Sequence, residues 1–370
     1  MADTIKSIKV SGGDYTDPQL WENDTDVSAG RWIGEIDDSN EYLDKNLNFS
    51  GGTGTPDADN FSWLRVTAGN KHSGVTGSGH ARIRDTAGHV ITMGRAFTVI
   101  EGVEIIIDSA GSSDECVRIT ADNFLTSRCI YRAAQETSQQ DGLYLNTAPI
   151  NVYADNCIFY NFDRAGIHSQ NDSGVNTATW NVDSCSMYNC GLVVDLEEGG
   201  GIMLRDAGLN VANVFNNWAI GNDANLAEDY HTETDGGGNA SWAGTDNIAG
   251  DASAEAKFTA SFDSVVLIDT DPGSGENIHV DSISGRDFNI TDEDTETVTQ
   301  NGVDRSATHP APQTTDGATK VQDLSTDIND VARTATWSIG AFEFVAAAAG
   351  GDEYISVEPQ RIIRHSGRYV

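Results

Sequence analysis

Positively charged side chains are scarce in this 370-residue chain. Only 22 lysines and arginines stand against 57 aspartates and glutamates, which gives a formal net charge of −35. A protein that binds nucleic acid or an anionic membrane surface needs charge of the opposite sign, because its affinity comes from neutralising phosphates. The composition therefore argues against nucleic acid and membranes as partners.

Long apolar runs are also missing. No stretch of about 18 consecutive apolar residues occurs, so we expect no transmembrane helix. The first residues, MADTIKSIKVSGGDYT, lack the charged start and apolar core of a secretory signal peptide. We therefore expect no secretion by that route.

Cysteine and proline are both sparse. Seven prolines stand against 38 glycines, and valine, isoleucine and threonine recur in short bursts, a composition typical of short strands joined by tight turns. The odd number of cysteines and the absence of a CxxC pair favour free, buried thiols over disulfides or a metal site. The five are Cys116, Cys129, Cys157, Cys185 and Cys190.

What the chain does have is a phrase that returns four times along its middle. Cys129, Cys157 and Cys185 are spaced 28 residues apart, and Trp218 follows 33 residues later in what we interpret as the same position. A fixed period in this range predicts a solenoid, in which each coil buries its apolar side against its neighbours. The four phrases are TSRCIYRA at 126–133, ADNCIFYN at 154–161, VDSCSMYN at 182–189 and FNNWAIGN at 215–222.

A second family of strands recurs between these phrases. It reads DGLYL at 141–145, AGIHS at 165–169 and GGIML at 200–204. Side chains alternate across a strand, so one set faces inward and the next faces outward. We expect Leu143, Ile167 and Ile202 to face the core, and Tyr144, His168 and Met203 to face the other side.

The two ends of the chain resemble a known family. SGGDYTDPQLWEN at 11–23 is similar to the opening cap of right-handed parallel β-helix proteins of the pectate-lyase-like superfamily, and DFNITDEDT at 287–295 followed by DINDVARTATWSIGAFEF at 327–344 resembles their closing cap. Asp330 stands near an expected glycine, and Ser338 replaces the usual aspartate. The matching positions are Asp327, Arg333, Trp337, Ile339, Gly340, Ala341 and Glu343.

The resemblance implies a fold and leaves the function open. We predict an all-β protein: a right-handed parallel β-helix with N- and C-terminal caps and an extended C-terminal tail. The expected parts are an N-terminal cap at 1–60, a body at 61–296 with an irregular loop at 223–260, a closing cap at 297–344, and a linker and basic tail at 345–370.

An enzyme of this family would use calcium held by carboxylates, together with an arginine or lysine that removes a proton beside a uronate. A glycosidase would need two carboxylates across a groove, a pattern that chance supplies easily on so acidic a surface. Solvated turns are the simpler interpretation, and His168 then reads as a surface histidine. The catalytic candidates are Asp163, Glu198, His168 and Arg205, with Asp141, Arg164 and Glu197 beside them.

No cofactor is expected, although two acidic loops could take calcium. They contain Asp269 and Asp271, and Asp292 and Asp294, at alternate positions. Neither loop has the glycine and glutamate spacing of a helix–loop–helix calcium site, so solvated turns are again the simpler interpretation. Trp242, in the predicted irregular loop, is the candidate for stacking against a sugar.

The C-terminal tail is basic on an otherwise acidic protein. A frayed terminus is one interpretation, and a docking segment that binds another subunit or the acidic body is the other, which we favour. Its candidate docking residues are Arg361, Arg364, His365 and Arg368.

A protein with an extracellular type of fold and no signal peptide resembles phage structural proteins. The leading hypothesis is therefore a virion protein: a spike, fibre or capsid decoration unit, assembled in the host cytoplasm and released by lysis. Its expected partners are other virion proteins through the tail, further copies in a homotrimer, and host-surface glycan. The alternatives are a lyase or glycoside hydrolase acting on capsular polysaccharide, and a plain carbohydrate-binding adhesin.

Overall fold

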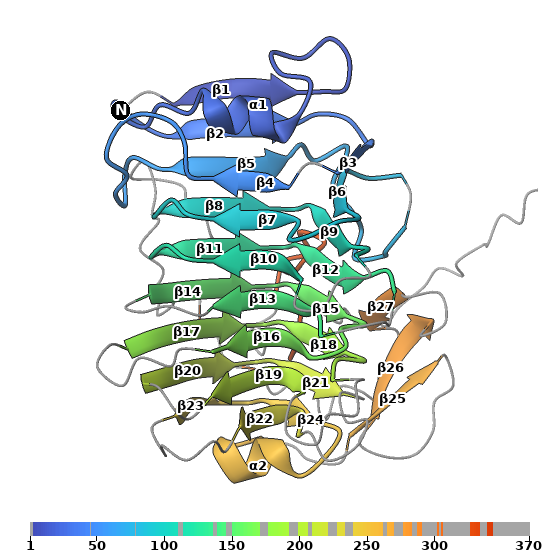
Figure 1. Cartoon of the computed structure of the whole chain (residues 1–370). Coiled ribbons are helices and arrows are strands. Elements are labelled where there is room, and N and C mark those ends of the chain that lie inside the picture. Colours follow the sequence, from blue (N-terminus) through green and yellow to red (C-terminus); the bar gives the residue numbers. More distant parts are fainter. Residues whose placement is uncertain are drawn as a thin grey trace, which may run out of the picture.

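A stack of parallel strands in three sheets makes up most of the molecule (Figure 1). The computed structural model describes residues 3–342 except 45, 78, 110–113, 136–138, 146–149, 171–176, 192–198, 206–208, 221–227, 234–239, 262–264, 270–276, 283–286, 291–301, 303–304, 306–325 and 334–338. None of the helices in this part of the chain is long and apolar enough to cross a membrane.

The chain visits the three sheets in a fixed order and completes about seven turns, winding as a right-handed coil. The nine-stranded sheet contains β1 (Thr4–Ile8), β2 (Trp32–Ile36), β5 (Ser62–Val66), β8 (Thr98–Glu101), β11 (Phe124–Ser127), β14 (Ile150–Asp155), β17 (Thr177–Asp183), β20 (Leu209–Phe215) and β23 (Ser241–Thr245). The eight-stranded sheet contains β3 (Glu41–Leu43), β6 (Arg82–Asp85), β9 (Glu104–Ile107), β12 (Ile130–Ala133), β15 (Ile158–Tyr160), β18 (Ser186–Tyr188), β21 (Trp218–Ile220) and β24 (Ile248–Ala249). The seven-stranded sheet contains β4 (Leu47–Phe49), β7 (Ile91–Met93), β10 (Glu115–Ile119), β13 (Asp141–Leu145), β16 (Ala165–Ser169), β19 (Gly200–Arg205) and β22 (Tyr230–Glu233). The predicted parallel β-helix is confirmed.

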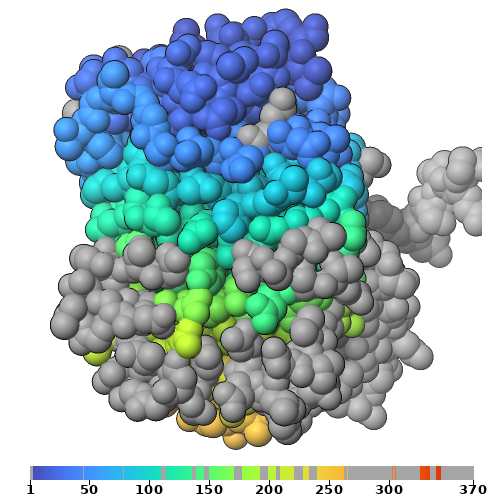
Figure 2. Space-filling model, viewed as in Figure 1, coloured from blue at the N-terminus to red at the C-terminus, as the bar shows by residue number. Residues whose placement is uncertain are grey.

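A short helix covers the first coil. In helix α1 (Pro18–Asn23), Asp17 caps the N-terminus and Pro18 begins the first turn, where its missing N–H costs nothing. Trp21 is fully buried and its ring meets Phe49 edge to face, 6.0 Å between centroids. The helix and β1 thereby cover the blue end of the rod in Figure 2. The predicted N-terminal cap at 1–60 thus includes β1 to β4 as well as this helix.

The other end differs from the sequence-based prediction. An irregular loop was predicted at 223–260, but the described residues of this stretch form β22, β23 and β24, which continue the coil, and helix α2 (Ser253–Lys257). The prediction does not hold for these residues, whose strands are short and polar and carry little apolar alternation. Phe258, at the end of α2, packs edge to face against Tyr230 and Trp242 and covers the last coil. A small fourth sheet follows, made of β25 (Val266–Asp269), β26 (Asn277–Ser282) and β27 (Asp287–Ile290).

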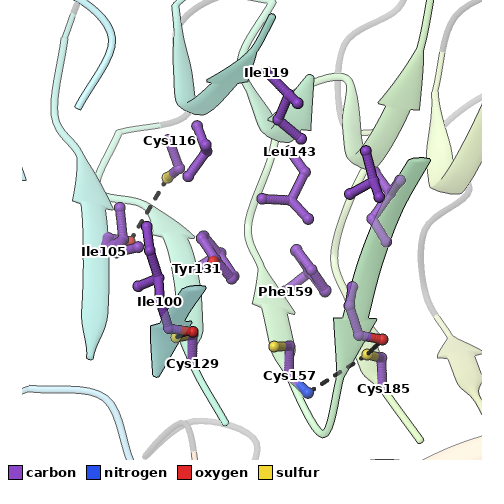
Figure 3. Close-up of a cluster of buried hydrophobic side chains, with 14 of the residues drawn as sticks. Ile100, Ile105, Cys116, Ile119, Cys129, Tyr131, Leu143, Cys157, Phe159 and Cys185 are labelled. Carbon is purple, nitrogen blue, oxygen red and sulfur yellow. Dashed lines mark hydrogen bonds between the residues drawn. The ribbon is translucent and has the colours of Figure 1, made fainter. Parts of the chain in front are cut away.

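The core is a column of inward side chains from all three sheets (Figure 3). Cys129, Cys157 and Cys185 stack in it, and the Cys157 amide donates to the Cys185 Sγ at 3.4 Å. All five cysteines are free and buried, which confirms that interpretation. Buried thiols behave here as small apolar side chains.

Trp218 does not occupy the cysteine position. In the ladder between β18 and β21, Trp218 pairs with Ser186, so Asn217 stands one residue earlier in the column of Cys185. The Asn217 Oδ1 accepts from the Cys185 amide at 2.7 Å, and its Nδ2 donates to the Val182 carbonyl at 3.0 Å. The phrase alignment was therefore wrong by one residue at this coil.

Each coil turns sharply between the nine-stranded and the eight-stranded sheet. One residue at this corner has a left-handed backbone: Gly102 (φ 75°), Arg128 (53°), Asn156 (50°), Ser184 (55°) and Asn216 (56°). Glycine and asparagine accept this conformation at little cost, whereas arginine does not, so surrounding contacts must hold Arg128 in place.

The segment that resembles a closing cap lies along the side of the coil. Its buried residues Ile328, Ile339 and Phe342 belong to one apolar cluster with Ile130 and Trp218, from the outer face of the eight-stranded sheet. We call residues 326–333 with 339–342 the flank segment. They tie several coils together from outside, while α2 covers the end.

Gly340 should be intolerant of any side chain. Its φ is +101°, and a Cβ there would lie 2.2 Å from the Trp218 Cδ1. We expect Gly340→Ala to lower the free energy of unfolding by about 2 kcal/mol or more, measured from urea midpoints. Gly69→Ala is the matched control, because that position is open and has no left-handed backbone. Equal midpoints for both variants would contradict this packing.

Candidate functional site

The outer side of the seven-stranded sheet carries most of the catalytic candidates. Val117, Leu143, Ile167 and Ile202 form one ladder that faces the core, which confirms the predicted alternation. The neighbouring ladder faces the other way. It runs through Arg118, Tyr144, His168, Met203 and His231.

Three ionisable side chains from β13, β16 and the turn before β16 meet on this side. Arg164 Nε donates to both carboxylate oxygens of Asp141, at 3.1 and 3.0 Å, and its Nη2 makes a further bond to Oδ2. The His168 Nδ1 lies 3.1 Å from the same Oδ2. Asp141 is fully buried, and His168 is 1 % exposed. The prediction of a surface histidine is therefore wrong: His168 faces outward from the sheet yet is covered.

The charge state of Asp141 follows from these neighbours. Burial alone would raise its pKa, but the Arg164 guanidinium and His168 outweigh that effect, so the pKa lies below its usual range. The aromatic ring of Tyr144 completes the group. Its centroid is 5.6 Å from the Arg164 guanidinium carbon, and the His168 ring meets it edge to face at 5.1 Å.

A second carboxylate stands one coil away. Glu115 pairs with Asp141 across the β10–β13 ladder and is buried, with its carboxylate against the Nδ1 of His89. Arg118 Nη1 approaches the other ring nitrogen of His89 at 3.0 Å. Burial raises the pKa of Glu115 above its usual range, and His89 only partly offsets this. The pKa values of these two adjacent carboxyl groups are thus shifted in opposite directions.

This arrangement contains elements of an acid–base site. Asp141 orients His168 as a carboxylate orients a general base, and Glu115 is a carboxyl group that holds its proton more tightly than usual. A base must also reach a proton on the substrate. Asp141, Arg164 and His168 are all buried, and Arg164 and His168 both bond to Asp141, so in this state the group is closed, and its chemistry is that of an internal ion pair between Arg164 and Asp141.

The other predicted residues are only partly brought together. Asp163 is buried beside Arg164 in the turn before β16, and Arg205 lies partly exposed at the end of β19. Glu197 and Glu198 lie outside the described residues, as do Arg361, Arg364, His365 and Arg368.

Trp242 belongs to β23 and faces the interior. It pairs with Ala212 in register and packs edge to face against Tyr230 and Phe258, at 6.3 and 5.8 Å between centroids. Its Nε1 donates to the Thr232 Oγ1 at 2.9 Å. The indole is thus held under α2 rather than displayed on a loop.

The two calcium candidates are not tested by the structure. The backbone of Asp269 ends β25, and its side chain, like Asp271, Asp292 and Asp294, lies outside what the structure describes. Within the described residues, no group of three or more histidine, cysteine or carboxylate side chains is placed to hold a metal ion. Calcium binding stays a prediction.

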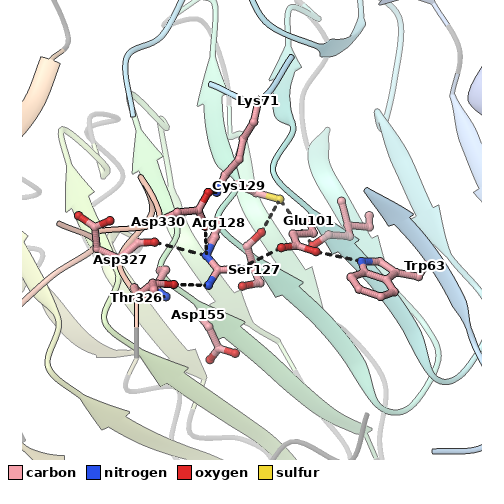
Figure 4. A network of polar contacts seen from close by, with 12 residues as sticks. Trp63, Lys71, Glu101, Ser127, Arg128, Cys129, Asp155, Thr326, Asp327 and Asp330 are labelled. Atoms are coloured by element: carbon pink, nitrogen blue, oxygen red, sulfur yellow. Dashed lines mark hydrogen bonds and ion pairs between the residues drawn. The ribbon is translucent and has the colours of Figure 1, made fainter. Parts of the chain in front are cut away.

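A second polar network lies at the corner between the nine-stranded and the eight-stranded sheet, around Arg128 (Figure 4). Arg128, held in its left-handed conformation, donates from Nη1 to Glu101 Oε1 at 3.0 Å and from Nη2 to Thr326 Oγ1 at 2.7 Å. Its Nε donates to the Asp327 carbonyl at 3.3 Å. Lys71 Nζ bonds the Asp330 Oδ2 at 3.0 Å. These contacts fasten the flank segment to the coil and account for the unusual backbone of Arg128.

Sequence reasoning missed Glu115, His89 and the role of Arg128. A signal for Glu115 was present, because ECVRI at 115–119 begins with an acid just as DGLYL at 141–145 does. No local signal marked Arg128, since its partners Asp327 and Thr326 lie about 200 residues further along the chain. Comparison with known proteins adds nothing to these assignments: no family model matches the chain, and no curated protein matches it.

Removing the Asp141 charge should destabilise the fold in a pH-dependent way. Asp141→Asn removes the buried carboxylate that accepts three hydrogen bonds from Arg164, so we expect a loss of about 3 kcal/mol at pH 7. The wild-type pKa is lower in the folded state, so the unfolded chain takes up the proton first as the pH falls. The stabilisation is therefore fully present above about pH 4 and is lost as the pH falls through the lower pKa of the folded state, so the difference between the two proteins should shrink towards pH 3. Urea midpoints between pH 7 and pH 3 measure this.

Glu115→Gln is the matched comparison. Burial opposes the charge of Glu115, so replacing it at pH 7 should cost clearly less than Asp141→Asn, while exposed Asp59→Asn should change nothing. If Asp141→Asn were as stable as Asp59→Asn at pH 7, the internal ion pair would not be structural.

Proposed function

We propose that this protein is a virion structural protein, a spike, fibre or capsid decoration unit of a phage or phage-like particle. The observation that carries the proposal is a closed cluster on the seven-stranded sheet, in which Arg164 and His168 both bond to Asp141 and all three side chains are buried. Polar contacts used in this way stabilise a rod, and none of these three groups is displayed to solvent.

The architecture supports the same role. The coils are joined by continuous parallel ladders, and α1 and α2 cover the two ends. The flank segment fastens several coils from outside, so the body is stiff. The net charge of −35 keeps such a rod soluble at high local concentration. Homotrimer formation and binding of host-surface glycan belong to this proposal by analogy with similar phage proteins.

The proposed link to the particle is the basic C-terminal segment. Arg361, Arg364, His365 and Arg368 stand in a chain that is otherwise strongly acidic, so they suit an acidic groove on a neighbouring virion protein.

Ending the chain at Gly351 should therefore abolish incorporation and leave the rod folded. We expect at least a tenfold fall in copies per purified particle, measured by quantitative mass spectrometry, with a cooperative thermal transition that shows the rod still folds. Full-length chain carrying Arg361→Gln, Arg364→Gln and Arg368→Gln should behave like the truncation. Normal incorporation of the truncated chain would contradict tail-mediated docking, and absence of the wild-type chain from every particle would contradict the virion role.

A polysaccharide lyase or glycoside hydrolase is the second candidate. It is favoured by one observation, the neighbouring carboxylates Glu115 and Asp141 whose pKa values are shifted in opposite directions. The structural role predicts no release of sugar fragments from capsular polysaccharide by the wild-type protein. Fragment release that disappears in Glu115→Gln, with the fold retained, would establish the enzyme instead.

A further inference from the structure

Exposed apolar side chains gather at one end of the rod. Ile5 is 50 % exposed, Val10 51 %, Leu20 47 % and Leu43 45 %. They lie in β1, in the loop after it, in α1 and in β3, all among the first 43 residues of the chain. Elsewhere in the described chain, only Val331 is a large apolar residue of comparable exposure, at 36 %. We call Ile5, Val10, Leu20 and Leu43 the N-terminal patch.

The same end has a partly open strand edge. In β1, Thr4 and Ile8 bond towards β2, through the Arg31 carbonyl and the Asp37 amide, and alternate residues point the other way. On that outer edge Ser7 is occupied, because its amide donates to the Asp14 carboxylate and its carbonyl accepts from the Tyr15 amide.

Ile5 lies on the same outer edge as Ser7, and no described residue bonds its backbone. The loop at 10–15 thus protects half of the edge and leaves a gap at Ile5. An open backbone position beside an exposed apolar side chain is suited to the addition of a short extended segment.

The charge around the N-terminal patch favours one segment of this chain as its occupant. Residues 3–44 contain eleven acidic and three basic side chains, a net charge of −8. The segment 359–370, PQRIIRHSGRYV, has three arginines, no acidic side chain and an apolar pair, Ile362 and Ile363. Within this chain it complements the patch in both charge and apolarity.

The flank segment brings residues 359–370 within reach of the N-terminal patch. Gly340 donates to the Asn216 carbonyl, Ala341 donates to Ser186 on β18, and the Phe342 ring lies against Gly74, in the loop after β5. The chain therefore leaves the described structure heading towards the N-terminal end. From the level of β18 to β1 there are about six strand spacings, or ~29 Å. The 16 residues of 343–358 span up to about 55 Å when extended.

We propose that residues 359–370 dock on the N-terminal patch of the same chain, with the backbone pairing at the open edge of β1 around Ile5. Ile362 and Ile363 cover the patch, and the arginines face its acidic surroundings. The tether makes the local concentration of the segment millimolar, which favours docking within one chain over capture by a second copy. If the proposed function holds, this docked form is the unassembled protein, and the particle competes for the same segment.

Hydrogen exchange on the isolated, folded protein tests the docking without any particle. We compare the full chain with a chain that ends at Gly351. The peptide that contains Ile5 should exchange about tenfold faster after truncation, while a peptide from β14 should be unchanged. Protection should fall in about 0.5 M salt, because the attraction is partly between exposed charges.

Substitutions in the patch provide the second arm. Ile5→Ser with Leu20→Ser should speed the exchange of residues 359–370 to the rate of an unstructured peptide, whereas Val331→Ser, the exposed apolar position outside the patch, should not. Equal exchange of the Ile5 peptide in full and truncated chains would overturn the proposal. Protection that rises with protein concentration, together with a dimer mass in light scattering, would assign the patch to a second copy and overturn docking within the chain.

Discussion

The in-register parallel pairing of successive coils is the constraint on which the rest of this structure depends. Each coil must place its three strands in register with those of the coil before it. The corner between two sheets must therefore turn within one or two residues. The left-handed backbone at Gly102, Asn156 and Asn216 meets that requirement. When the coils are in register, inward side chains stack into columns. A cysteine in one coil then predicts a small or hydrogen-bonding side chain at the same position of the next coil.

The same stacking explains why charged residues come together on the outer faces. Side chains at equivalent positions of neighbouring coils lie about 5 Å apart, so an acid in one coil meets whatever the next coil offers. On the seven-stranded sheet this brings Asp141 to His168 and Arg164, and Glu115 to Asp141. On the corner of the eight-stranded sheet it places Arg128 beside Glu101. A cluster that resembles an active site can thus arise from the stacking of coils alone.

Much of the fold could be predicted from the sequence, because a solenoid repeats its local signals. The period, the inward column of cysteines and the alternation at Leu143 and Ile167 were all readable. The alignment failed at Trp218 because Asn217 replaces the cysteine, and an amide that bonds the coil before it has the same spatial role as a thiol but a different residue type. The burial of His168 and the partners of Arg128 depend on contacts between distant parts of the chain, which no local pattern encodes.

The central claim is that a closed, rod-shaped body serves as a building block of a particle. A cryo-electron microscopy reconstruction of particles purified from the source organism tests it most directly. The account predicts a rod of about seven coils at a defined, symmetric position, with the C-terminal segment seated in a neighbouring protein. A reconstruction at a resolution that would show such a rod, with no density for it on any part of the particle, would contradict the claim.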